Sequence, residues 1–314
     1  MDNLIFSLNA TVPLFLLMVL GLFLRKIGWI DEMFAEKMNR FVFMVPLPVL
    51  VFRDLATVDF EQVWDVGYIL FCFMATLLSI AISAGVSLAW KEREIRGEFI
   101  QACYRSSAAI LGIALIQNIY GSAGMAPLMF IGSVPLYNVM AVIVLSLFKP
   151  GQQGLDKKVL KKSVFGIATN PIIIAIIIGL FWSALRIPLT GILGKTVSDI
   201  ANIASPMGLI TMGASFSMSE SFTKIKPTVA AAFLKLIGVC TIFLPMAVMM
   251  GFRQEGLVAI LVMLGSATTV SCFVMAKNMG HEGVVSSGVI MLTTLLSAFT
   301  LTGWLYVLKS LELI

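Results

Sequence analysis

The amino-acid sequence predicts an all-α polytopic membrane protein, and three observations carry that prediction. The chain has 314 residues, of which 59% are hydrophobic and only 12% are charged. Its mean hydropathy of +0.98 is too high for a soluble globular protein. Apolar runs of about 17 to 25 residues, long enough to span a bilayer, can be placed ten times. A shift of 160 residues carries the first five runs onto the last five without a gap.

The ten predicted transmembrane helices therefore form two sets of five. The second span of each set is short and contains proline, so we expect Pro46 and Pro48 to interrupt one span and Pro206 to interrupt the other. Because five is odd, the second set must be inverted relative to the first, as in many secondary transporters. We expect one membrane domain made of two inverted five-helix repeats, at residues 1–150 and 151–314. The predicted spans are 4–24, 41–56, 66–90, 99–119, 125–148, 164–185, 201–216, 227–250, 256–276 and 285–308.

The distribution of Lys and Arg predicts the orientation in the cell membrane. These residues number 15 in the connections after the odd-numbered spans and 5 on the opposite face. Because cytoplasmic connections are enriched in Lys and Arg, both termini are expected to be extracytoplasmic. The net charge of +5 does not indicate a nucleic-acid partner, since no basic cluster is interleaved with aromatic residues on a soluble face. The expected surroundings are the lipid bilayer.

The sequence lacks the motifs that are typical of metal sites, disulfide bonds and hydrolases. Cys72, Cys103, Cys240 and Cys272 all fall inside apolar runs, without a CxxC motif, and His281 is the only histidine. There is no HExxH, GxSxG or Walker A motif. We therefore expect neither a cofactor nor a metal, and we do not expect an enzyme.

Two corresponding spans carry polar residues at membrane depth, where unsatisfied polar groups are costly. The segments RSSAAILGIALIQNIYG at 105–121 and GSATTVSCFVMAKNMG at 265–280 each place hydroxyl side chains before an apolar run. If both helices unwind there, the breaks can cross near the midplane and direct half-helix amino termini at an anion. Close helix packing through small residues explains the same pattern equally well. The hydroxyl residues are Ser106, Ser107, Ser266, Thr268, Thr269 and Ser271.

Four further polar residues fall inside predicted spans. Arg105 and Lys235 either attract an anionic substrate or serve structural roles, since both explanations meet the desolvation cost. Tyr137 and Asn138 follow Pro135 and either line a cavity or form an interhelical hydrogen bond. All 17 Asp and Glu residues are placed in loops or at helix ends, which favours an anionic or neutral substrate over a cation.

Four motifs together resemble the auxin efflux carrier family of bacterial permeases and plant PIN-type carriers. They are MNRFVFMVPLPVLVF at 38–52, LGIALIQNIYG at 111–121, the Asn170–Pro171 pair and SCFVMAKNMG at 271–280. The resemblance implies that helices 4 and 9 are broken and cross at the substrate site. It also implies transport of organic anions, which are auxin in plants and dicarboxylates such as malate or malonate in bacterial members.

The family's site positions fall on Val51 in helix 2, Ser107 and Ile113 in helix 4, Tyr137 in helix 5, and 268–272 in helix 9. The family commonly has Asn at the position of Ser107. It commonly has Pro at the crossover positions, where this chain has Ala114, Ala267 and Cys272.

The leading prediction is a secondary transporter of small organic anions, such as dicarboxylates or auxin-like carboxylates, that works by alternating access. A sodium-coupled symporter resembling the bile-acid carriers and a non-transporting membrane receptor are the alternatives. Coupling to H⁺ or Na⁺ and assembly as a homodimer stay open. The predicted substrate site comprises Val51, Arg105, Ser106, Ser107, Ile113, Tyr137, Asn138, Lys235, Thr268, Thr269, Ser271 and Cys272.

Overall fold

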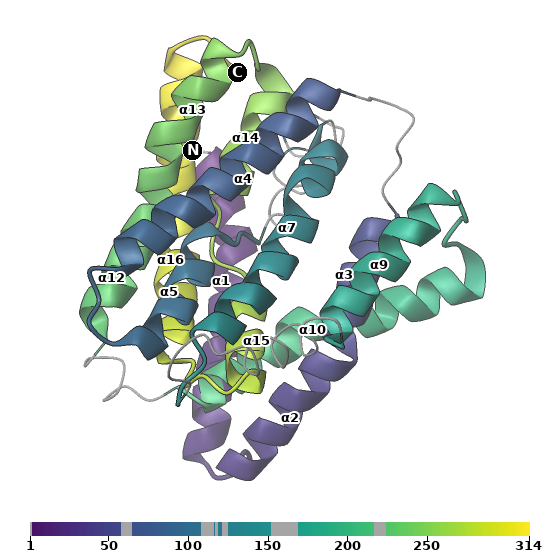
Figure 1. Ribbon diagram of the computed structural model, residues 1–314, viewed down its shortest axis with the longest axis vertical. Coiled ribbons are helices and arrows are strands. Elements are labelled where there is room, and N and C mark those ends of the chain that lie inside the picture. The colour runs from purple at the N-terminus through teal and green to yellow at the C-terminus, as the bar shows by residue number, and fades with distance from the viewer. Residues whose placement is uncertain are drawn as a thin grey trace.

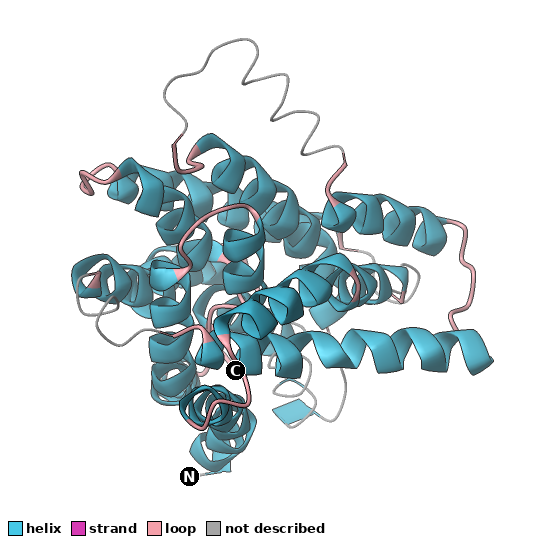
Figure 2. Ribbon diagram, turned by 90° about the horizontal axis from the view of Figure 1, so that it is seen from below, coloured by secondary structure: helices cyan, strands magenta, loops and turns pink. Residues whose placement is uncertain are grey.

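A computed structural model describes residues 2–57, 65–107, 116, 119–120, 125–151, 169–216 and 224–314. Within these ranges every regular element is a helix, which confirms the all-α class (Figures 1 and 2). By length and composition, four segments of this described part are suited to cross a membrane. They are Val66–Ser87, Leu128–Leu147, Ile225–Met249 and Val284–Ser310. The count of ten spans and the inversion of the second set stay predictions.

The helices follow the predicted spans in order. They are α1 (Asp2–Lys26), α2 (Glu32–Met44), α3 (Pro46–Ala56), α4 (Val66–Ser87), α5 (Arg93–Tyr104), α7 (Ala126–Leu147), α9 (Pro171–Ala184) and α10 (Gly191–Ala214). The remainder are α12 (Ile225–Phe233), the π-helical turn η2 (Leu234–Gly238), α13 (Val239–Met249), α14 (Gln254–Gly265), α15 (Ser271–Asn278) and α16 (Val284–Ser310).

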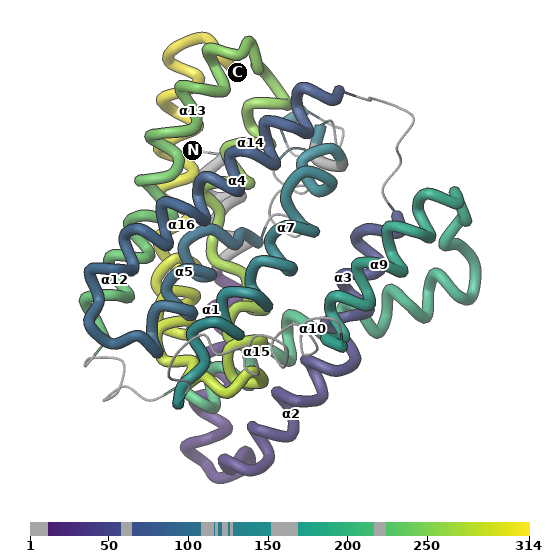
Figure 3. Tube along the Cα trace, in the orientation of Figure 1, coloured from purple at the N-terminus to yellow at the C-terminus, as the bar shows by residue number. Residues whose placement is uncertain are grey.

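The helices pack around two apolar cores. The first core is built from α4, α5, α7, α12, α13, α14 and α16, and Leu234 of η2 packs against it. The second joins α1, α2, α3, α9 and α10 to one side of α7, α15 and α16. In Figures 1 and 3, α2, α3, α9 and α10 extend to one side of the remaining helices. The chain therefore consists of two packed groups of helices that meet along α7, α15 and α16.

Close backbone contact joins α1 to α10 within the second group. A Cβ atom added at Gly21 would overlap the carbonyl oxygen of Ile210, and one added at Gly213 would overlap that of Met18. Small residues permit such close approach between membrane helices, because they let the two backbones meet. These glycines set the separation of α1 and α10.

The prolines have different effects in the two short spans. Val45 leaves helical geometry (φ −124°, ψ −74°) and separates α2 from α3, which begins at Pro46. This break agrees with the prediction for Pro46, because the α conformation is disfavoured for a residue before proline, whereas Pro48 lies inside α3 and does not interrupt it. The prediction for Pro206 is wrong, since α10 continues through it from Gly191 to Ala214. A proline removes one backbone donor, and a membrane helix can absorb that loss without ending.

The two polar segments are interrupted. Helix α5 ends at Tyr104, and Arg105 is extended (φ −77°, ψ 129°). Helix α14 ends at Gly265, Ser266 is extended (φ −73°, ψ 165°), and α15 begins only at Ser271. The predicted break at Ile113 and Ala114 lies outside the described residues. Helix 9 therefore breaks at its hydroxyl cluster without a proline.

One buried carboxylate corrects the expected distribution of acidic residues. Glu98 lies inside α5 and is 2% exposed. Its two carboxylate oxygens accept hydrogen bonds from the backbone amides of Gly283 (2.8 Å) and Ser286 (2.9 Å), at the start of α16. A carboxylate is stabilised at a helix amino terminus by these amides and by the helix dipole. The hydropathy pattern missed this position because α5 begins at Arg93, before the predicted span.

Candidate substrate site

A pocket lies between the two groups of helices, at the interrupted segments. Its cavity volume is about 80 Å³, which is below the range of about 300 to 1,000 Å³ for sites that hold drug-sized ligands. One wall comes from α2, α3 and α10, and the other comes from α7, α15 and the two interruptions. Its lining residues are Val42, Leu47, Leu50, Val51, Asp54, Arg105, Ser106, Ser107, Val134, Tyr137, Asn138, Ala204, Ser205, Thr269, Val270, Ser271 and Val274.

The two interruptions are hydrogen-bonded to each other. The backbone amide of Ser107 donates to the carbonyl oxygen of Ala267 (2.9 Å). Thr268 Oγ1 donates to Ala102 O near the end of α5 (2.8 Å), and Ser106 Oγ donates to Met263 O near the end of α14. Carbonyls in the last turn of a helix lack intrahelical partners. Each interruption thus supplies a hydroxyl donor to the helix end of the other.

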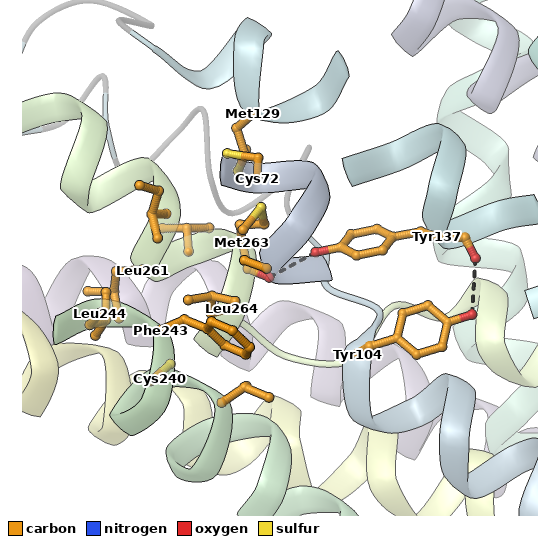
Figure 4. Close-up of a cluster of buried hydrophobic side chains, with 14 of the residues drawn as sticks. Cys72, Tyr104, Met129, Tyr137, Cys240, Phe243, Leu244, Leu261, Met263 and Leu264 are labelled. Carbon is orange, nitrogen blue, oxygen red and sulfur yellow. Dashed lines mark hydrogen bonds between the residues drawn. The ribbon is translucent and has the colours of Figure 1, made fainter. Parts of the chain in front are cut away.

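Tyrosines reinforce the end of α14 (Figure 4). Tyr137 OH donates to Met263 O (3.0 Å), so this carbonyl accepts from both Ser106 and Tyr137. Tyr104 OH donates to the carbonyl oxygen of Tyr137 (3.3 Å), as Figure 4 also shows. The phenol of Tyr137 therefore links α7 to the interrupted helix 9, which is a structural role at the edge of the pocket.

Arg105 is a buried cation that lines the pocket. Arg105 is 2% exposed. Its Nη2 donates to Asn138 Oδ1 (2.8 Å) and to Ser271 Oγ (2.7 Å). Nη1 lies 2.8 Å from Met275 Sδ, and Nε is buried without a hydrogen-bond partner. Arg105 forms no ion pair with any residue that the structure describes. All its described hydrogen-bond partners are neutral, so none of them cancels the charge of the guanidinium.

The amino terminus of α15 faces the same pocket. Thr269 and Ser271 are lining residues, and their hydroxyl oxygens lie 3.2 Å apart. Ser271 is the first residue of α15, and it accepts from Arg105. The amides of Cys272 and Phe273 are bonded to Thr269 O and Val270 O (both 3.0 Å), so α15 favours an anion through the positive end of its dipole. A guanidinium, two hydroxyls and a helix amino terminus therefore converge on one cavity.

The structure brings most of the predicted site residues together. Val51, Arg105, Ser106, Ser107, Tyr137, Asn138, Thr269 and Ser271 line the pocket. Ser107 Oγ makes no hydrogen bond within the described residues, and this hydroxyl is partly exposed. Ile113 lies outside the described residues.

Three predicted residues lie behind the pocket wall. Thr268 is 2% exposed, and its backbone amide donates to Thr293 Oγ1 (3.0 Å). Cys272 is fully buried, and its carbonyl oxygen accepts from Gln101 Nε2 (2.9 Å). Lys235 is also fully buried, and it reaches the pocket only through Ser106. These three residues support the interruptions from behind.

Asp54 is a lining residue that the sequence prediction missed. It lies in α3 three positions after Val51, and residues so spaced share one helix face. Its Oδ1 lies 3.0 Å from Arg53 Nη2, and Arg53 Nη1 donates to Asn202 Oδ1 (2.8 Å). The i to i+3 spacing from Val51 is the signal that could have identified it. A carboxylate and a guanidinium therefore line the same pocket, from different groups of helices.

The comparison with known families supplies the family assignment. The family model described as "Membrane transport protein" matches residues 6–305. The chain belongs to this family. The match confirms the resemblance to the auxin efflux carriers, and it establishes a membrane transporter family for nearly the whole chain. An "Uncharacterized transporter" of Methanothermobacter thermautotrophicus is 24% identical over 236 residues, which cover 73% of this chain and 72% of the relative.

Proposed function

We propose that the protein is a secondary transporter of small organic anions and that the substrate carboxylate binds to Arg105. The single observation that carries this proposal is the buried guanidinium in the pocket, whose Nε has no partner and whose described hydrogen-bond partners are all neutral. A buried charge without a counter-charge is costly, and an incoming carboxylate would remove much of that cost. The family membership supports transport as the activity.

The other residues of the pocket favour a substrate that has both a polar end and an apolar part. Thr269, Ser271 and Ser107 offer hydroxyl groups near the guanidinium, and the amino terminus of α15 adds positive potential. Leu47 and Val51 on α3 form part of an opposite, apolar wall. This arrangement suits a carboxylate attached to a short, partly apolar body, such as a small dicarboxylate or an auxin-like acid. Arginine recognises a carboxylate through two parallel donors, which makes it suited to this role.

The position of the pocket supports alternating access. Its walls come from both packed groups, so a rocking movement of one group against the other would open it to either side of the membrane. The hydrogen bonds between the interruptions would stay within one moving group, while the contacts of α2, α3 and α10 with the pocket would change. We include in this proposal ten spans in two inverted repeats, a location in the cell membrane and extracytoplasmic termini.

Uptake by reconstituted vesicles tests the proposal. Purified protein would be offered a panel of labelled monocarboxylates, dicarboxylates and their neutral amides. We expect saturable uptake of at least one carboxylate and none of its amide. Arg105→Gln should reduce this uptake at least tenfold, since hydrogen bonds to a charged group contribute about 1.5 to 3 kcal/mol.

Arg253→Gln provides the matched control. Arg253 is exposed and donates to the carbonyl oxygens of Val248 and Phe252, away from the pocket. This variant should transport like the wild type. Equal transport by folded Arg105→Gln and wild-type protein would refute the assignment of the site, and binding of carboxylates without any flux would refute transport.

A further inference from the structure

The ammonium group of Lys235 is a second buried cation, and the proposed anion site does not use it. Lys235 lies in the π-helical turn η2 and is fully buried. Its Nζ donates to Leu264 O (2.6 Å) and to Ser106 Oγ. It forms no ion pair within the described part of the chain, and it does not line the pocket. The group therefore resides among neutral oxygen atoms of the protein.

These oxygen atoms form the kind of cluster that binds a small monovalent cation. Leu264 O belongs to the last turn of α14, at the negative end of its dipole. Ser106 Oγ comes from the other interruption, and the hydroxyl of Ser266, two residues after Leu264, is buried without a partner. Unwound carbonyls and half-helix carboxyl ends coordinate Na⁺ in many secondary transporters. The side chain of Lys235 places its ammonium group at these oxygen atoms.

The local fold explains how Lys235 reaches this cluster. A π-helical turn adds one residue to a helical turn and redirects the side chains around it, and such turns are frequent at functional sites. At the same level α13 approaches the end of α14 closely, because a Cβ atom at Gly265 would lie 2.7 Å from Cys240 Sγ. The turn and the glycine together bring the ammonium group to the helix end.

We propose that the Lys235 ammonium is a resident monovalent cation, in the place that a coupling ion would otherwise occupy, so that transport needs no Na⁺. This inference rests on the proposed transport function. The ammonium cannot dissociate during the cycle, and its charge would repel a second cation from the same oxygens. Lys235 is thus a positioning residue, because it holds Ser106, and with it the end of α5, against the end of α14.

The first test measures the wild-type protein in vesicles. Initial uptake of the transported carboxylate should agree within about twofold in Na⁺, K⁺ and N-methylglucamine media, since a covalently attached cation leaves no ion to bind. Strict dependence on Na⁺ would overturn the proposal.

The second test removes the ammonium. Lys235→Ala leaves space at the oxygen cluster, and it should lose most uptake in N-methylglucamine medium and regain it with Na⁺ or methylammonium. Its melting temperature should rise by about 2 °C or more on addition of either cation, because a ligand that binds only the folded state stabilises it. Lys235→Met is the matched control, since its apolar side chain fills the same space and should allow no rescue.

The melting measurement separates this inference from the proposed function. It requires no substrate, so it stays informative if no carboxylate is found to be transported. If Lys235→Ala can be purified only in NaCl and not in N-methylglucamine chloride, that result supports the inference. If neither cation raises its melting temperature above the rise seen for the wild type and Lys235→Met, the inference is wrong.

Discussion

Arg105 Nη2 lies 2.7 Å from Ser271 Oγ, so the residue that directly follows α5 is hydrogen-bonded to the residue that begins α15. Both residues line the pocket between the two groups of helices. The guanidinium is held by neutral partners on α7 and α15, which orient it without cancelling its charge. This arrangement keeps a full positive charge available to a substrate anion.

Replacing a neutral partner of Arg105 with a carboxylate should weaken substrate binding without lowering the stability of the protein. Asn138 Oδ1 accepts from Arg105 Nη2 (2.8 Å), so Asn138→Asp places a permanent anion beside the guanidinium. We expect the KM for the carboxylate to rise at least tenfold, because the internal anion competes with the substrate. We also expect the melting temperature to stay unchanged or rise, since the buried cation gains a partner.

Asn202→Asp makes the same change outside the pocket. Asn202 is exposed and accepts from Arg53 Nη1 (2.8 Å). Its KM should change far less than that of Asn138→Asp, because Asn202 reaches the pocket only through the Arg53–Asp54 pair. An Asn138→Asp protein that transports carboxylates normally would show that Arg105 is not the substrate ligand.

The carboxylate of Asp54 should weaken the binding of anions. Asp54 lines the pocket, and its carboxylate brings a negative charge there beside its ion-pair partner Arg53 (3.0 Å). Asp54→Asn should lower the KM for a carboxylate about fivefold, which corresponds to about 1 kcal/mol of relieved repulsion. Uptake kinetics in vesicles measure the change, with the exposed Asp199→Asn as the control. A raised KM would instead indicate that Asp54 helps to bind the substrate.

The hydroxyl of Thr268 should contribute to stability rather than to substrate contact. Thr268 Oγ1 donates to Ala102 O (2.8 Å) and lies behind the pocket wall. Thr268→Val removes the donor to a buried carbonyl and should destabilise the protein by about 1 to 3 kcal/mol. Thermal unfolding in detergent measures this loss.

Thr196→Val is the matched control, because Thr196 is exposed and donates to Ile192 O within its own helix (2.9 Å). It should leave the melting temperature within about 1 °C of the wild type, as expected for most surface substitutions. If Thr268→Val unfolds like the wild type but no longer transports, the threonine contacts the substrate after all.

The contact between α1 and α10 should tolerate no added methyl group. Gly213→Ala places its Cβ on the carbonyl oxygen of Met18, and we expect a destabilisation of about 1 to 3 kcal/mol. Gly303→Ala in α16 meets no atom within 4 Å and should stabilise that helix by about 0.5 to 1 kcal/mol. Opposite shifts in melting temperature are the expected result. Equal shifts would show that α1 and α10 are not in backbone contact.

Parts of the site were predictable because they depend on local composition. The hydroxyl clusters beginning at Ser106 and Ser266 marked the segments where α5 and α14 end, although the pattern left a helix break and close helix packing equally open. Composition could not show that Pro206 lies within an unbroken helix, because neighbouring helices decide whether a proline ends a membrane helix or is absorbed.

The assignment of individual hydroxyls required the tertiary structure. Thr268 and Thr269 are adjacent and chemically alike, yet Thr268 binds α5 and Thr269 lines the pocket. No helical periodicity applies in an interrupted segment, so the sequence does not predict the direction of these side chains. The same holds for Arg105 and Lys235, which are both buried cations with different neighbours.

The sequence by itself determined the helical membrane class and the family, and it marked the two polar segments, because hydropathy and small polar residues act over a few neighbouring residues. Only the tertiary structure decided that Arg105 faces the pocket while Lys235 is bound to the end of α14. Those contacts join residues 33 positions apart for Arg105 and Asn138, and 129 apart for Lys235 and Ser106. Such pairs form through the packing of whole helices, which the pattern along the chain does not encode.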